Sequence, residues 1–161
     1  MGLPMEPSDS QQQDPLPESQ AYPATTKQAA AEINGIKTDV MSISFSDKIM
    51  IIITQNGRVA QWVTVPLLSD NPTATDPYFQ TSNSDDDALL PSTRFQPRVL
   101  LGAGGSEREM IGQLYASQIA HAITTKNLGE ERPLMLGLGL AKVESGREVF
   151  LQIVELVTKV I

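Results

Sequence analysis

Two Asn-Gly dipeptides, at residues 34–35 and 56–57, limit the fold of this chain more than any other feature. Asn-Gly favours a type I′ turn, because both central residues need positive φ, and such turns join antiparallel strands. The segments 36–45, 48–54 and 58–65 beside these turns are rich in Ile, Val and Met. The region from 26 to 66 is therefore predicted to form antiparallel strands joined by tight turns.

The alternation of side chains along these strands predicts which residues share a face of the sheet. We expect Gln55 to pair with Arg58 around the second turn, and Phe45 to lie opposite Ile49 in the preceding hairpin. One face then carries Met41, Ile43, Phe45, Ile49, Ile51, Ile53, Ala60, Trp62 and Thr64. The other face carries Val40, Ser42, Ser44, Met50, Ile52, Val59, Gln61, Val63 and Val65.

Residues 98–161 no longer follow the strand period throughout and predict a short strand, a helix, a strand and a second helix. The start of each helix is marked by a Ser with a Glu three residues later, the pattern of a capping box. These pairs are Ser106 with Glu109 and Ser145 with Glu148. The fold class is therefore α+β, with about six mainly antiparallel strands and two helices on one face.

Two helices can cover only one face of such a sheet, yet the second face of the predicted sheet is also apolar. The economical arrangement is a dimer in which two subunits stack sheet on sheet through this face. The predicted dimer interface consists of Met50, Ile52, Val59, Gln61, Val63 and Val65.

Charge and composition divide the chain into a tail, a domain and a long loop. Residues 1–25 and 70–97 each sum to −4, which leaves +1 for the rest of a chain whose net charge is −7. We expect 1–25 to be a disordered tail and 26–161 a single domain, in which 67–97 is a long, acidic, flexible loop. The near-neutral body has no basic cluster or long apolar run, so neither nucleic acid nor a membrane is an expected partner.

The residue types that most catalytic and metal sites require are scarce. There is no Cys, and His121 is the only His, so we expect no enzyme activity, cofactor or metal site. The glycine run 102–105 matches neither the dinucleotide fingerprint nor the P-loop, and Asp85–Asp87 lacks the spacing of a calcium loop. Ser106 could be imagined as the nucleophile of a small hydrolase, but no base accompanies it.

Three segments resemble the proteasome assembly chaperone 3 family in order and spacing. They are FSDKIMIIITQNGRVAQWVTV (45–65), RVLLGAGG (98–105) and PLMLGLGLAK (133–142), and a C-terminal helix follows them. The resemblance covers 27–69 and 98–161, and it is that of a fungal-type member with an extended N-terminus and loop. Both extensions depart from the usual family pattern.

The absence of Cys, of a signal or transit peptide and of a long apolar run predicts a soluble protein of the cytoplasm or the nucleus. The resemblance implies a non-catalytic chaperone that binds proteasome alpha subunits while the alpha ring forms. It implies a heterodimer with a proteasome assembly chaperone 4-like protein, or a homodimer. It also places the alpha-subunit contact near the 67–97 loop, where we assign it to Leu67, Leu68, Asp70, Arg94 and Arg98. The alternative is a longin- or roadblock-like scaffold subunit of a trafficking or GTPase-regulating complex.

Overall fold

The computed structural model of the chain describes Gly2 and residues 24–68, 95–102, 104–143 and 146–161. The predicted tail and the predicted 67–97 loop therefore lie mostly outside the described residues. The elements, in chain order, are β1 (Thr25–Ile33), β2 (Ile36–Ser44), β3 (Ile49–Gln55), β4 (Gln61–Val65), β5 (Arg98–Leu101), α1 (Ser106–Lys126), β6 (Leu134–Gly139) and α2 (Arg147–Thr158).

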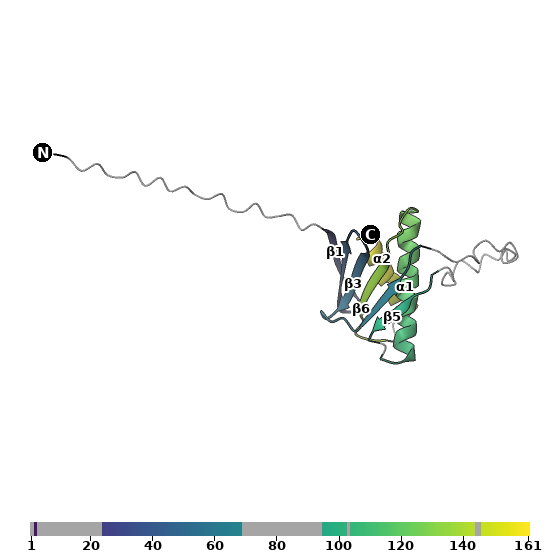
Figure 1. Cartoon of the computed structure of the whole chain (residues 1–161). Coiled ribbons are helices and arrows are strands. Elements are labelled where there is room, and N and C mark those ends of the chain that lie inside the picture. Colours follow the sequence, from purple (N-terminus) through teal and green to yellow (C-terminus); the bar gives the residue numbers. More distant parts are fainter. Residues whose placement is uncertain (1, 3–23, 69–94, 103, 144–145) are drawn as a thin grey trace.

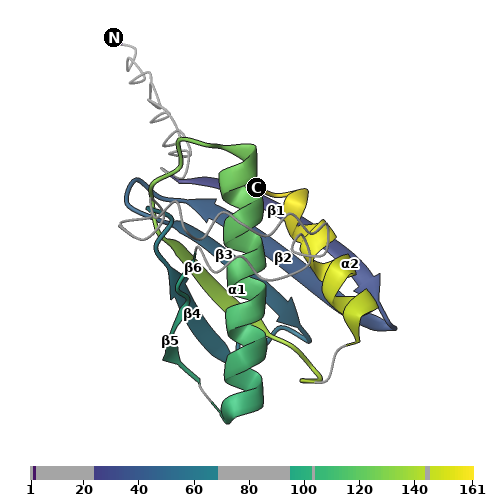
Figure 2. The ribbon, with the colours of Figure 1, turned by 90° about the vertical axis from the view of Figure 1, so that its right-hand side faces the viewer.

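The six strands form one sheet in the order β1-β2-β3-β6-β4-β5, and both helices lie over the same face of it (Figures 1 and 2). All neighbouring strands are antiparallel except β3 and β6, which are parallel. α1 packs on β4, β5 and β6, whereas α2 packs on β1 and β2. The predicted α+β class and the placement of both helices on one face are confirmed.

Both Asn-Gly dipeptides form the expected turns. Asn34 and Asn56 adopt φ values of 51° and 57°, and the glycines that follow them adopt 74° and 68°. Only Gly and a few residues such as Asn adopt this region at low cost, which is why the dipeptide fixes the turn. The first turn joins β1 to β2 in an antiparallel hairpin.

The predicted pairing of β3 with β4 is wrong. Gln55 and Arg58 do form a bridge around the second turn, but the strands then separate and β6 lies between them. Ile51 is level with Leu136 of β6, which is in turn level with Val63 of β4. Because β6 lies between the two strands, each residue of β4 is on the face opposite to the one predicted for it. The side chains of β3 still alternate as predicted.

The register predicted for β2 and β3 is also wrong, by one residue. Ser44, not Phe45, lies opposite Ile49, because the backbone N–H of Phe45 donates to the carbonyl of Lys48 at 3.0 Å and closes the turn. A shift of one residue moves every side chain of the shifted strand to the opposite face of the sheet. Met41 and Ile43 therefore share a face with Met50 and Ile52, on the side away from the helices.

The hydrophobic core lies between the sheet and the two helices. Its sheet side is formed by alternate residues of the central strands, which are almost fully buried: Ile51, Ile53, Val63, Val65, Leu134, Leu136 and Leu138. Ile119 of α1, with Ile153 and Val157 of α2, packs on them. Burial of these side chains is the main force that holds the helices to the sheet.

The start of α1 shows what the capping-box pattern predicts and what it does not. The helix begins at Ser106, but Gly105 is the N-cap, and no side chain caps the helix. The backbone N–H of Glu109 donates to the carbonyl of Gly105 at 3.1 Å, as in an ordinary first turn. The helix start is confirmed and the capping box of Ser106 is wrong; Ser145, of the second pair, lies outside the described residues.

Tyr115 of α1 contributes a buried hydroxyl without a hydrogen-bond partner in the described part of the chain. Its ring packs on that of Phe150 in α2, with centroids 4.7 Å apart, and burial raises the pKa of its hydroxyl. Because a buried unpaired hydroxyl is costly, Tyr115→Phe is expected to raise the free energy of unfolding by about 1 kcal/mol. Urea denaturation measures this, and Tyr115→Leu, which removes the ring contact, should lower it.

Candidate protein-interaction surface

The face of the sheet opposite the helices, hereafter the open face, is apolar at its centre. Its apolar side chains are Met41 and Ile43 of β2, Met50 and Ile52 of β3, Met135 of β6, Trp62 of β4 and Leu101 of β5. The first six are half-buried against one another, and Leu101 is 67% exposed. No helix of the described chain covers this face (Figure 2). An apolar area of this kind is typical of a protein-interaction site.

The structure divides the six residues of the predicted dimer interface. Met50 and Ile52 lie on the open face, as expected. Gln61, Val63 and Val65 lie on the helix side and are at most 3% exposed, so their assignment to the open face is wrong. The insertion of β6 is the cause, because it reverses the faces of β4. Val59 belongs to the segment of chain that connects β3 to β4, and it is 40% exposed.

Trp62 reaches the open face because β6 has no side chain beneath it. A Cβ on Gly137 would lie 3.0 Å from two carbons of the indole ring. Trp62 and Gly137 are level in the β4–β6 ladder, so the ring lies across the central strand. The space left by Gly137 on the open face is thus occupied by this chain's own tryptophan.

Beside this apolar centre, the open face is hollowed over the first three strands. The hollow has a volume of about 430 Å³. Its open-face residues are Gln28, Ala30, Asp39, Met41, Ile52 and Thr54. Small side chains on β1 and β3 create the space, and Asp39 provides its carboxylate. The open face therefore combines an apolar centre with an acidic hollow.

The predicted alpha-subunit contact is only partly described. Leu68 and Arg98 are exposed, whereas Leu67 is 3% exposed and belongs to the core, so its assignment to the contact is wrong. Leu67 packs in the same core cluster as Phe95, and these two residues flank the segment 69–94. The contact residues Asp70 and Arg94 lie within this segment, outside the described residues.

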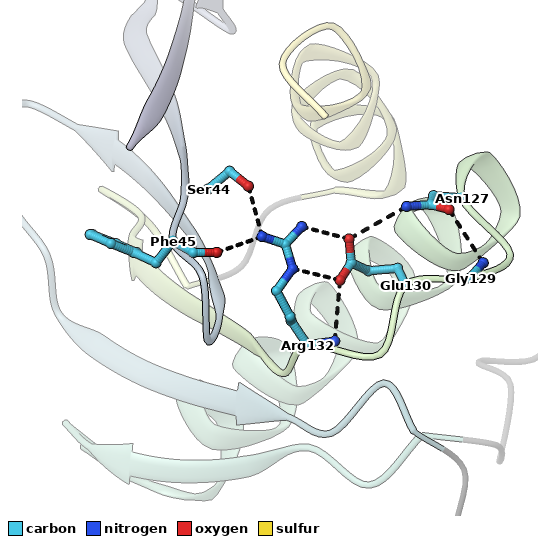
Figure 3. Close-up of polar contacts among 6 residues, drawn as sticks. All are labelled: Ser44, Phe45, Asn127, Gly129, Glu130 and Arg132. Carbon is cyan, nitrogen blue, oxygen red and sulfur yellow. Dashed lines mark hydrogen bonds and ion pairs between the residues drawn. The ribbon is translucent and has the colours of Figure 1, made fainter. Parts of the chain in front are cut away.

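Arg132 ties the connection between α1 and β6 to the end of β2 (Figure 3). Its Nε and Nη2 donate to the two carboxylate oxygens of Glu130 at 2.8 and 2.7 Å. Its Nη1 donates to Ser44 Oγ at 2.9 Å and to the carbonyl of Phe45. The guanidinium thus donates hydrogen bonds to three residues of the same chain, and we interpret this cluster as structural.

Glu130 should make the stability of the fold depend on pH. Hydrogen bonds from Arg132 lower the pKa of this carboxyl, so its stabilising effect is complete above its ordinary pKa of 4.5 and is lost as the pH falls through the lower, folded value. Glu130→Gln is expected to lower the free energy of unfolding at pH 7 by about 1 kcal/mol. It should also flatten the fall in stability below pH 4. Urea denaturation at several pH values tests this, and a variant with the wild-type acid slope would contradict it.

The described residues offer little for catalysis. They contain no group of three His, Asp or Glu side chains placed to hold a metal ion, and His121 is exposed on α1. Gly102, in the glycine run, has φ 81°, and a Cβ there would lie 2.0 Å from the carbonyl oxygen of Ala60. Close packing against the start of β4 thus explains this glycine. No described helix is long and apolar enough to cross a membrane.

Two comparisons relate the chain to known proteins. The family model described as "Proteasome assembly chaperone 3" matches residues 51–160, which is more than half of the chain. This range includes β4, β5, α1, β6, α2 and most of β3, and therefore both central strands of the sheet. A search of curated proteins finds no match.

Among solved structures, the chain is similar to one described as "Crystal Structure of a Novel Chaperone Complex for Yeast 20S Proteasome Assembly". The TM-score is 0.51 at 12% sequence identity, and the similarity covers 84% of this chain and 97% of the yeast complex's chain. At this identity the likeness concerns the fold. The shared fold extends over nearly the whole of that chain.

Proposed function

The chain belongs to the proteasome assembly chaperone 3 family and is a proteasome assembly chaperone; from this premise we propose how it works. It acts without catalysis, as one subunit of a dimer that binds alpha subunits of the core particle while the alpha ring forms. Its partner is a proteasome assembly chaperone 4-like protein or a second copy. It acts in the cytoplasm, and also in the nucleus.

The open face is the observation that supports a dimer most directly. Met41, Ile52, Trp62 and Leu101 lie at the same level on four strands, so the apolar surface runs across most of the sheet. A second sheet stacked on this face would remove it from water, as in other sandwiches of two sheets. The two pairs of helices would then lie on the outer sides of the dimer.

Leu68 and Arg98 support an alpha-subunit contact beside the segment 69–94. Both are exposed, and they lie close to the two ends of that segment. Arg98 is in β5, at the edge of the sheet, and Leu68 follows β4. Leu68 lies outside the strands, so a subunit stacked on the open face would leave it accessible.

Affinity purification of the tagged chain from its own cell extract, followed by mass spectrometry, tests the proposed function. We expect proteasome alpha subunits together with a second small chaperone, and no mature beta subunits. Recovery of GTPases or vesicle adaptors in place of alpha subunits would favour the longin- or roadblock-like scaffold. A Leu68→Ala variant should retain the small chaperone but recover less alpha subunit.

A further inference from the structure

The acidic hollow lies where the apolar centre of the open face ends. Asp39 is level with Ala30 of β1 and Thr54 of β3, and Thr54 is level with Gly139 of β6. Small side chains thus surround a carboxylate on both sides across the sheet. Met41 and Ile52 border the same hollow, so any subunit that covers the apolar centre also closes over Asp39.

The carboxylate has only partial compensation within the chain. Lys37 Nζ lies 3.4 Å from Asp39 Oδ1, but the Lys37 side chain is 76% exposed and that of Asp39 is 44% exposed. Glu32 lies opposite Lys37 across β1 and β2, so this end of the face has two carboxylates and one ammonium. An exposed ion pair of this kind contributes little to stability. If a partner removed water from Asp39, a further cation would be needed to offset the cost of burying the carboxylate.

Arg98 of a second copy does not reach Asp39 in an aligned sandwich. Besides Lys37, the described strands place one cationic side chain on the open face, Arg98 of β5. If the two-fold axis of such a dimer is parallel to the strands, Arg98 of one copy lies at the level of Ile43 of the other copy. That level is about 13 Å along the strand from Asp39. A two-fold axis across the strands would leave Arg98 over β5, at the far edge of the sheet.

We propose that the acidic hollow receives an arginine or lysine side chain from a different subunit, which stacks its own sheet on the open face. Arginine suits the position best, because its planar guanidinium can bond a carboxylate through two N–H groups. Asp39 then determines which partner the chain accepts, and the apolar centre supplies most of the area. This inference rests on the stacking of sheets proposed above.

The test measures binding of the full chain to the proteasome assembly chaperone 4-like protein of the same cells, by calorimetry at low and high salt. Asp39→Asn keeps the shape of the side chain and removes its charge. It is expected to weaken binding about tenfold or more and to reduce the dependence of the affinity on salt. Glu32→Gln, which changes a carboxylate of the same face outside the hollow, is the matched control and should weaken binding less.

Ile52→Asp separates failure of this inference from failure of the proposed interface. If Ile52→Asp abolishes binding while Asp39→Asn binds as tightly as wild type or more tightly, the sheets stack but Asp39 meets no cation, and the inference is wrong. If neither substitution changes binding, the open face is not the interface, and both proposals fail. Wild-type chains could also form a homodimer. If Asp39→Asn weakens that homodimer as much as it weakens binding to the partner, a second copy supplies the cation, and the inference is wrong.

Discussion

Ile52→Asp is expected to yield a folded chain that no longer associates through the open face. Ile52 lies at the centre of this face, level with Met41 and Gly137, so a partner's sheet would enclose a new carboxylate that has no cation of its own, because Asp39 binds the cation proposed for the hollow. An unpaired charge buried in an apolar interface costs about 3–5 kcal/mol, which corresponds to a loss of affinity of more than a hundredfold. Sedimentation velocity with and without the partner measures the association.

Val63→Asp is the matched substitution on the other side of the same sheet. Val63 is 0% exposed beneath the helices, so the carboxylate would be buried in the monomer itself. The cost is then a large part of the total stability of a small domain, about 5–15 kcal/mol, and we expect a largely unfolded chain by circular dichroism. The opposite outcome, an unfolded Ile52→Asp variant and a folded Val63→Asp variant, would refute the assignment of faces.

Gly139→Ala is expected to cause the second large effect, a loss of about 3 kcal/mol or more of stability. A Cβ at this position would lie 1.6 Å from the carbonyl oxygen of Arg58 and 2.6 Å from its carbonyl carbon. These are backbone atoms, so the connection between β3 and β4 would have to move away from β6. Thermal and urea denaturation give the change, and wild-type stability would contradict this close packing.

Gly129→Ala is the control for this substitution. Gly129 lies in the exposed connection between α1 and β6, and the nearest atom to an added Cβ is Asn127 Oδ1 at 3.8 Å. We expect a change within about 0.5 kcal/mol. A similar loss of stability in both variants would indicate a general cost of replacing glycine rather than the contact with Arg58.

The family could be predicted from the sequence because its pattern consists of local features. The apolar strand before Asn56-Gly57 and the strand before Gly102 are contiguous segments, and the family model covers most of the first and all of the second. The open face could be predicted only in part. Met50 and Ile52 were assigned correctly because β3 alternates strictly, whereas Trp62, Met135 and Leu101 reach this face through pairings that no local pattern indicates.

The sequence by itself determined the turns, the type of each element and the single helix-covered face. Positive φ is a property of Asn-Gly itself, and periodicity is a property of each segment, so neither depends on distant residues. Only the tertiary structure decided that β6 separates β3 from β4. Gln55 and Arg58 bridge in either arrangement, and the choice depends on how Leu134, Leu136 and Leu138 fill the centre of the core, about 80 residues further along the chain.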